Sequence, residues 1–364
     1  MRIALMIASL TKGGAERVMV NLADYFADYG HEVILVTQYI KENEYPLNQK
    51  VKRIICELSE EELTESRITN FIRRFSKLRN IWKANKPDVI LSFIGKNNIM
   101  TILTSRFLDI PVAVSVRAEP GEEYPGMFMR LLARNLFKMA DKVILQTKQC
   151  FDFFPEAVRR KAVILKNPVS EHFFRERFTG ERDKVIVAVG RVDENKNHEM
   201  LIKAFAGIAD EFPDYKVVIY GEGDCRSKLL DLVQELGLSG RILLPGSIEN
   251  VSEAIYKTRV FVLTSNSEGS PNTLIEAMAM GLTVISTDCP CGGPAELILD
   301  NINGILTPVG DVEKLQVNLQ KVLNDLQFAD NLGEKAKETS DIFRRDKVCK
   351  EWESVLSEIS RKRE

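Results

Sequence analysis

Short apolar runs alternate with helical patterns along most of this chain of 364 residues. The first run is Ile3–Ala8, and after an interruption at 167–183 the alternation restarts at Val185–Val189. Such alternation predicts parallel β-sheets that carry helices on both faces. Because a single hydrophobic core rarely grows beyond about 250–300 residues, a chain of this length is expected to divide. We therefore predict the α/β class, with two doubly wound domains at 1–168 and 182–345.

One strand–loop–helix unit, Arg259–Gly281, carries two glutamates. Glu268 lies in the loop, and Glu276 lies in the first turns of the helix. In an open parallel sheet, ligands bind at the carboxyl ends of the strands, where a helix start also offers N–H groups to an anion. Such carboxylates often only complement the helix dipole or lie in solvent. The turn between them, Gly269–Asn272, favours instead a ligand site in which both act as acceptors.

Two cations, Arg191 and Lys196, follow the first strand of the second domain. If that domain is a parallel sheet, they open on the same edge as the two glutamates. Two cations and a helix start suit a diphosphate, and two carboxylates suit hydroxyl groups. Together they indicate a nucleotide sugar as the ligand.

A pair of glycines, Gly13 and Gly14, stands at the start of the first helix. Glycine there allows a ligand to approach the backbone closely, although an ordinary tight turn explains the pair equally well. The pattern is not G-x-G-x-x-G, so a dinucleotide-dependent oxidoreductase is disfavoured.

The composition argues against several other classes of protein. A net charge of −2 and an isoelectric point near 6.1 lack the basic excess of a general nucleic-acid binder. Six scattered cysteines and three unclustered histidines predict reduced thiols and no histidine-based metal centre. Neither a signal-peptide layout nor an apolar run of about 20 residues is found, so we expect a cytoplasmic protein.

The segments GRVDENKN and EGSPNTLIEAMAMG resemble two motifs of the retaining glycosyltransferases with the GT-B fold, in family 4. The likeness covers nearly the whole chain, through KGGAERV, PDVILSF, SVRAEP, KNPV, DCPCGGPAELI and NGIL. It implies two Rossmann-like domains that face a central cleft. Its nearest likeness is to bacterial enzymes that add N-acetylgalactosamine, galactose or related sugars to undecaprenyl-diphosphate-linked glycans. The implied function is transfer of a hexose or N-acetylhexosamine from a UDP-sugar to a lipid-linked or oligosaccharide acceptor in surface polysaccharide or glycan synthesis.

The resemblance also implies roles for the residues that match its motifs. Arg191 and Lys196 bind the donor diphosphate and stabilise the leaving nucleotide. Glu268 faces the transferred sugar, and Glu276 holds the ribose hydroxyls. The other donor-binding positions contribute backbone N–H groups or close approach: Gly13, Gly14, Asn272, Thr273 and Leu274. Retention by front-face attack is implied, and no metal or other cofactor is, because the two cations and the helix start take the place of a metal ion.

On the acceptor side the chain departs from the family, because residues 89–117 hold no histidine. Polar residues near the strand ends of this region become the acceptor-side candidates: Asn97, Asn98, Arg117 and Glu119. Arg117 suits an acceptor phosphate, although ordinary solvated loops explain all four equally. The resemblance further implies that the last helix, within 346–364, packs on the first domain.

Two amphipathic patterns are compatible with a membrane surface. Thr64–Lys86 combines seven basic residues with an apolar stripe, and Met127–Met139 is apolar with three basic residues. Each is either a solvated or sheet-packed helix, or a contact for anionic lipid or a lipid-linked substrate. The second reading places the protein on the inner face of the cell membrane.

Two other functions compete with sugar transfer. A non-catalytic subunit that binds nucleotide sugars has UDP affinity without turnover. Another GT-B enzyme, such as a sugar-nucleotide epimerase or a phosphorylase, releases UDP without an acceptor or requires phosphate.

Overall fold

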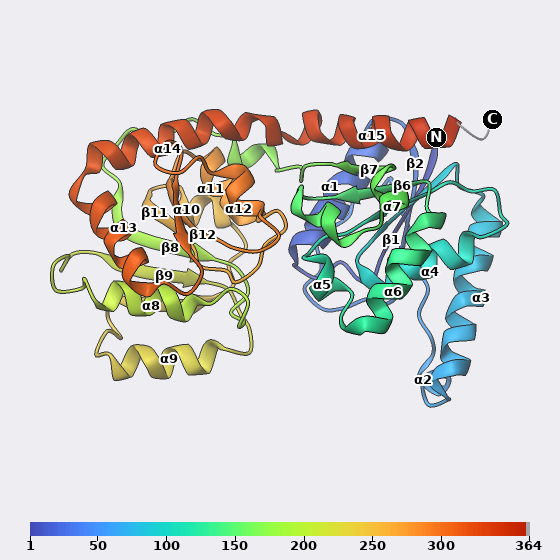
Figure 1. The fold of residues 1–364 in the computed structure, drawn as a ribbon, viewed down its shortest axis with the longest axis horizontal. Coiled ribbons are helices and arrows are strands. Elements are labelled where there is room, and N and C mark those ends of the chain that lie inside the picture. Colours follow the sequence, from blue (N-terminus) through green and yellow to red (C-terminus); the bar gives the residue numbers. More distant parts are fainter. Residues whose placement is uncertain (362–364) are drawn as a thin grey trace. The chain divides into compact units, whose positions relative to one another are not determined.

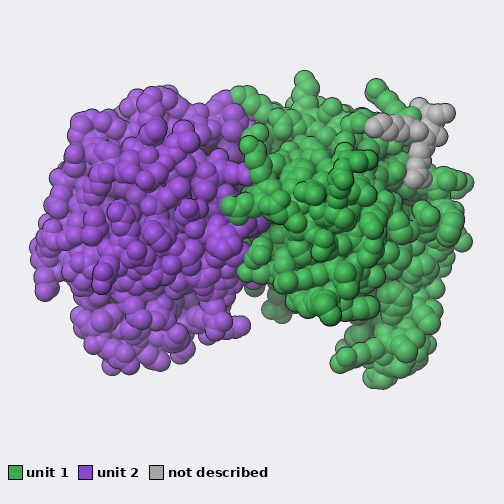
Figure 2. Space-filling model, viewed as in Figure 1, with its two compact units in different colours: residues 1–168, 345–364 green, residues 169–344 purple. Residues whose placement is uncertain are grey.

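The computed structural model describes residues 1–361 and contains two compact units. Unit 1 comprises residues 1–168 and the chain from 345 onward, and unit 2 comprises residues 169–344 (Figure 2). The segment 169–181, which lies outside both predicted domains, is part of unit 2.

Unit 1 is built on a seven-stranded sheet, counted over the described residues, in the order β3-β2-β1-β4-β5-β6-β7 (Figure 1). Its strands pair in parallel and are β1 (Arg2–Ile7), β2 (Glu32–Thr37), β3 (Lys52–Ile55), β4 (Val89–Phe93), β5 (Val112–Ser115), β6 (Lys142–Leu145) and β7 (Ala162–Ile164). Its α-helices are α1 (Gly14–Asp28), α2 (Glu60–Leu63), α3 (Arg67–Asn85), α4 (Gly95–Ser105), α5 (Pro120–Glu123), α6 (Gly126–Leu136), α7 (Glu156–Arg159) and α15 (Arg345–Arg361).

Unit 2 repeats this plan with a six-stranded sheet in the order β10-β9-β8-β11-β12-β13. Its strands also pair in parallel and are β8 (Asp183–Val189), β9 (Lys216–Tyr220), β10 (Ile242–Gly246), β11 (Thr258–Leu263), β12 (Thr283–Asp288) and β13 (Ile305–Pro308). Its α-helices are α8 (His198–Ala206), α9 (Arg226–Glu235), α10 (Val251–Ile255), α11 (Asn272–Ala279), α12 (Gly293–Leu297), α13 (Val312–Asn324) and α14 (Leu326–Ser340).

The central strand β11 shows why the apolar runs become buried parallel strands. Val260 and Val262 pack in one hydrophobic cluster, and Phe261 and Leu263 pack in another. Successive side chains of a strand point to opposite faces, so both faces of this sheet are covered. The polar groups of unit 2 are therefore displaced to the loops at the ends of the strands, where a ligand can be bound.

The last helix, α15, completes the core of unit 1. Trp352 is fully buried, its indole N–H donates to the Lys166 carbonyl at 2.9 Å, and its ring centroid lies 5.6 Å from that of Phe93. Val348, Leu356 and other apolar residues of α15 belong to the same hydrophobic cluster as β1. The end of the chain is thus a structural part of unit 1.

Two predictions about unit 1 were wrong in detail. The helical pattern 64–86 is divided, because the Ser66 side chain accepts the Thr69 N–H and begins α3 after the separate short helix α2. The predicted last strand, β6, is followed by β7, whose three residues are only partly buried and make no apolar run. Within the described residues, no helix is both long and apolar enough to cross a membrane.

Candidate active site

Two loops of unit 2 meet at the carboxyl ends of adjacent strands. β8 pairs with β11 through Ile186–Val260 and Val187–Phe261, and both strands run in the same direction. The loop 190–197 follows β8, and the loop 264–271 follows β11. The strand pairing therefore brings the predicted cations and the predicted glutamate of the site to one edge.

Lys196 and Glu268 form an ion pair at this edge. Lys196 Nζ lies 2.5 Å from Glu268 Oε1, and Ser265 Oγ donates to the same oxygen at 2.6 Å. The two side chains are only 16% and 12% exposed. Because water is largely excluded, the attraction between them is stronger than that of a surface pair.

Backbone and amide hydrogen bonds join the two loops beside this pair. Thr264 Oγ1 donates to the Lys196 carbonyl at 2.9 Å, and the Asn266 N–H donates to the Asn195 carbonyl at 2.7 Å. The Asn195 amide donates in turn to the Ser267 carbonyl at 3.0 Å. These bonds hold the charged groups in place before any ligand arrives, which is what an electrostatic site requires.

Arg191 differs from Lys196 in that its side chain is 72% exposed, although it lies 3.2 Å from the Asp193 carboxylate. Its backbone is held from below by His198, a buried residue whose Nε2 lies 3.1 Å from the Arg191 carbonyl oxygen. Since a carbonyl only accepts, Nε2 carries the hydrogen and the imidazole is neutral. Burial lowers the pKa of His198 to about 4. A neutral histidine thus supports the loop that carries both cations.

We expect His198→Gln to reduce the pH dependence of stability. Between about pH 4 and 6.5 the folded protein keeps His198 neutral, whereas the unfolded chain protonates it, so the free energy of unfolding falls as the pH falls. The shift from 6.5 to about 4 corresponds to roughly 3 kcal/mol. Urea unfolding at about pH 7 and about pH 4.5 measures it, with His31→Gln in unit 1 as the control. Equal pH dependence in the wild type and His198→Gln would contradict this assignment.

Glycines that the sequence analysis did not count as site residues also shape this edge. A Cβ on Gly221 would lie 1.8 Å from the Gly190 carbonyl oxygen, and a Cβ on Gly223 would lie 2.3 Å from that of Val192. The backbone after β9 therefore packs directly on the Arg191 loop. The signal was present as G-E-G after a strand, but only the contact reveals its importance.

The segment after β12 supports Glu268 in a similar way. The Glu268 N–H donates to the Pro290 carbonyl at 3.1 Å, and the Gly293 N–H donates to the Glu268 carbonyl at 3.2 Å. A Cβ on Gly293 would lie 2.0 Å from the Gly269 carbonyl oxygen. Burial, with a smaller effect of the Glu268 charge, raises the pKa of Cys289 to about 12, so this nearby thiol stays protonated.

The predicted donor-binding residues of α11 divide into a surface group and a buried group. Asn272 and Thr273 form the partly exposed first turn of the helix. The Leu274 N–H already donates to the Pro271 carbonyl at 3.1 Å, which leaves it a poor phosphate donor. Glu276 is only 2% exposed, so its predicted contact with ribose stays a prediction.

The predicted residues of unit 1 have mostly internal contacts. Gly13 caps α1 and is partly exposed, and Gly14 is exposed. Asn97 and Asn98 are buried: the Asn97 amide donates to the Phe93 carbonyl, and that of Asn98 to the Ser115 carbonyl. Both asparagines are thus part of the packing of α4.

Arg117 and Glu119 lie in the loop after β5. Arg117 Nη2 donates to Asn167 Oδ1 at 2.5 Å, and its guanidinium lies 4.6 Å from the centre of the Phe93 ring. Burial lowers the pKa of Arg117 to about 10, which still leaves it charged at neutral pH. Glu119 is partly exposed and precedes α5.

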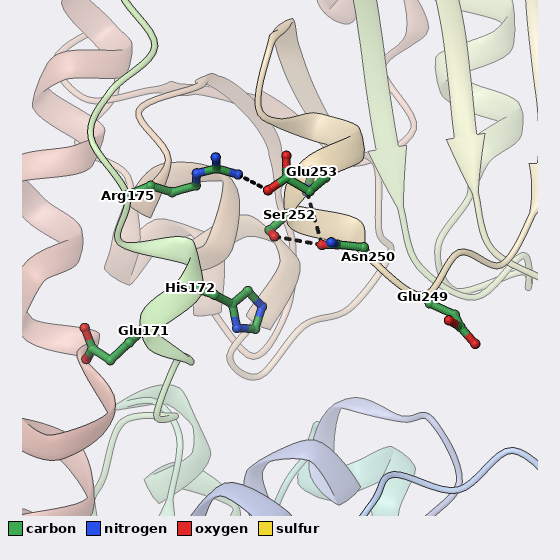
Figure 3. A pocket seen from close by; sticks show the side chains of 7 residues that line it. All are labelled: Glu171, His172, Arg175, Glu249, Asn250, Ser252 and Glu253. Carbon is green, nitrogen blue, oxygen red and sulfur yellow. Dashed lines mark hydrogen bonds and ion pairs between the residues drawn. The ribbon is translucent and has the colours of Figure 1, made fainter.

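A cavity of about 590 Å³ lies elsewhere on unit 2 (Figure 3). Arg175 contacts the Glu253 carboxylate in its wall, and Asn250 Oδ1 accepts from Ser252 Oγ and the Glu253 N–H. Its lining contains none of the predicted site residues: Glu171, His172, Arg175, Glu249, Asn250, Ser252 and Glu253. In residues 1–361, no group of three or more His, Cys, Asp or Glu side chains is arranged to hold a metal ion.

Comparison with known proteins identifies the family. Residues 12–172 match Glycosyltransferase Family 4, and residues 169–339 match Glycosyl transferases group 1. The chain is 31% identical over 363 residues to GalNAc-α-(1→4)-GalNAc-α-(1→3)-diNAcBac-PP-undecaprenol α-1,4-N-acetyl-D-galactosaminyltransferase of Campylobacter jejuni, covering 99% of each chain. It is 27% identical to the N-acetylgalactosamine-N,N′-diacetylbacillosaminyl-diphospho-undecaprenol 4-α-N-acetylgalactosaminyltransferase of the same organism, covering 96% of this chain and 98% of that one.

A solved structure gives the fold. HepE from Anabaena, crystallised in complex with UDP, superposes with a TM-score of 0.85 at 18% identity, over 98% of this chain and 100% of that one. Two parallel sheets with this strand order and this neighbour are those of the GT-B fold. This chain therefore belongs to glycosyltransferase family 4.

Proposed function

We propose that this glycosyltransferase moves a hexose or N-acetylhexosamine from a UDP-sugar to a lipid-linked glycan acceptor, with retention of the anomeric configuration. The observation that carries the proposal is the desolvated Lys196–Glu268 pair beside the exposed Arg191. The two Campylobacter relatives are named for transfer to undecaprenol-linked acceptors, and HepE was solved with UDP-glucose as well as UDP. These names support a UDP-sugar donor and a lipid-linked acceptor.

The charges of the site suit a reaction in which a diphosphate leaves. Negative charge grows on the nucleotide as the glycosidic bond breaks, and fixed cations lower the barrier by stabilising it. In this proposal Arg191 holds the diphosphate from the exposed side. The Lys196 ammonium turns from Glu268 to the phosphate oxygens, which releases the Glu268 carboxylate to accept from the sugar hydroxyls. No metal ion is needed in this scheme.

Transfer itself tests the proposal. The purified chain is incubated with polyprenyl-diphosphate-linked glycans in detergent, a panel of UDP- and GDP-sugars, and a metal chelator. We expect one UDP-sugar to glycosylate an acceptor, with the donor's anomeric configuration kept in the product as read by NMR. UDP affinity without turnover would favour the binding subunit, and a changed donor sugar without any acceptor would favour an epimerase. Inversion, or loss of activity with the chelator, would contradict the corresponding part of the proposal.

We further propose that unit 1 touches an anionic membrane surface. Ile68 on α3 is 73% exposed, and Met127 and Phe128 on α6 are 79% and 75% exposed. Part of the basic charge of α3 is offset, since Arg73 pairs with Glu65 and Lys77 pairs with Glu62. The apolar side chains therefore provide much of the expected affinity, and the basic residues that remain make it sensitive to salt.

Co-sedimentation with vesicles of mixed anionic and neutral lipid measures this contact. We expect the wild type to bind and Met127→Glu/Phe128→Glu to bind several-fold more weakly, because each new carboxylate opposes insertion and repels the anionic surface. Val317→Glu, at an exposed apolar position of α13, is the matched control. Wild-type protein that stays in the supernatant, or equal binding by both variants, would contradict the proposal.

A further inference from the structure

Glu123, the last residue of α5, accepts hydrogen bonds from four donors in unit 1. Its Oε1 accepts from the Gly95 N–H at 2.7 Å and from the Tyr124 hydroxyl at 3.1 Å. Its Oε2 accepts from the N–H groups of Arg117 at 2.7 Å and Ala118 at 3.1 Å. An ionised carboxylate is an acceptor only, and it matches this set of donors. One side chain thus holds the loops that follow two neighbouring strands, β4 and β5.

The first of these loops is strained. Ile94 has a φ of +73°, a conformation that is unfavourable for a β-branched residue and of the kind that costs about 1–3 kcal/mol. Gly95 follows with a φ of +30°, and a Cβ there would lie 3.2 Å from the Glu123 carbonyl oxygen. Strain of this kind persists only where neighbouring contacts fix the backbone. The bond from the Gly95 N–H to Glu123 is such a contact, placed next to the strained residue.

The same carboxylate sits at the N-terminus of α4. Gly95 is the first residue of that helix, and its N–H points at Glu123. Negative charge at this end is favourable because the helix dipole is positive there. The charge therefore comes from the chain itself, so we do not assign this helix start to a ligand phosphate.

The second loop carries Arg117. Glu123 fixes its backbone N–H, while Phe93 and Asn167 hold its guanidinium. Tyr124 extends the network, since its hydroxyl donates to Glu123 and accepts from the Asn98 amide at 3.2 Å. The buried Asn98 and the cation at the strand end are thus connected through Glu123.

We propose that Glu123 is a positioning residue of the transferase, which holds the loops after β4 and β5 in the shape needed to bind the acceptor. The inference rests on the proposed function, in which unit 1 takes the acceptor and unit 2 takes the donor. It concerns no contact between Glu123 and a substrate.

The variant Glu123→Gln tests it. The new amide group presents N–H donors to a pair of donors, so two of the four bonds are lost and the strained turn loses part of its support. We expect the KM for the acceptor to rise about tenfold or more. UDP affinity, measured by calorimetry on the same protein, stays within about twofold of the wild type, because none of the predicted cations or carboxylates of the donor site lies in unit 1. A general loss of structure would lower both together.

Two further variants of the same helix region complete the series. Glu122→Gln makes the same chemical change one position earlier, at an exposed side chain, and we expect wild-type kinetics. Tyr124→Phe removes one of the four donors, and we expect a smaller rise in the acceptor KM, about threefold, with UDP affinity unchanged. If Glu123→Gln does not fold, Tyr124→Phe decides the question by the same two measurements.

The outcomes separate this inference from the function on which it rests. An active wild type together with a wild-type acceptor KM in Glu123→Gln, or in Tyr124→Phe where it stands in, overturns the inference alone. An equal loss of acceptor and UDP binding also overturns it. A wild type that transfers no sugar to any acceptor contradicts the proposed function, and the inference fails with it.

Discussion

Lys196→Ala lowers the rate of sugar transfer by roughly 10²–10³-fold in our expectation, the range seen when one preorganised electrostatic group is removed. Two effects combine. The cation that would stabilise the leaving diphosphate is lost, and Glu268, only 12% exposed, loses the ammonium that lies 2.5 Å away. Initial rates at saturating donor and acceptor measure the first effect, and urea unfolding measures the second.

Two controls separate catalysis from stability. Lys203→Ala removes a lysine from an exposed pair with Glu199 on α8, at 2.7 Å, and we expect little change in either measurement. The double variant Lys196→Ala/Glu268→Gln removes both charges, so it should recover stability relative to Lys196→Ala without recovering activity. Lys196→Ala with wild-type transfer rates would contradict the assignment of the donor site.

Gly221→Ala should destabilise unit 2 by at least about 3 kcal/mol and abolish UDP binding. The added Cβ would lie 1.8 Å from the Gly190 carbonyl oxygen, and the φ of +149° at Gly221 is one that residues with a side chain rarely adopt. Both are backbone features, so no side chain can move aside to relieve them. The loop that carries Arg191 must shift, and with it the predicted diphosphate site.

The measurement is urea unfolding of the variant beside a UDP titration. Gly240→Ala serves as the control, because no heavy atom lies within 4 Å of its built Cβ. Its stability should equal or slightly exceed that of the wild type, since alanine restricts the unfolded chain more than glycine does. An unfolding midpoint in Gly221→Ala equal to that of the wild type would show that the two loops are not packed as described.

Local patterns predicted the regular elements where the apolar run was long. The strands at Glu32–Thr37 and Val89–Phe93 match the prediction at both ends, because nearly every residue in them is buried. The strands β3 and β7 were not predicted, since both are short and none of their residues is fully buried. Edge strands take their stability from pairing with a neighbour, which leaves a weak trace in the sequence.

The site shows the same division. The types of residue in the two loops predicted a binding site for a diphosphate and hydroxyl groups, and that chemistry is still the basis of the proposal. Their mutual contacts were not predictable, because Lys196 and Glu268 are 72 residues apart and meet only through the pairing of β8 with β11. For the same reason Asn97 and Asn98, which the pattern suggested for the acceptor side, proved to be buried partners of backbone carbonyls.

By itself the sequence determined the α/β class, the two repeats of strand and helix, and the family, because hydrophobic periodicity and loop motifs are local properties of the chain. Only the tertiary structure decided which polar groups face each other: Lys196 with Glu268, Gly221 with Gly190, and Glu123 with the loops after β4 and β5. Those contacts depend on strand order and on the close approach of backbones distant in sequence. No pattern within a single segment records them.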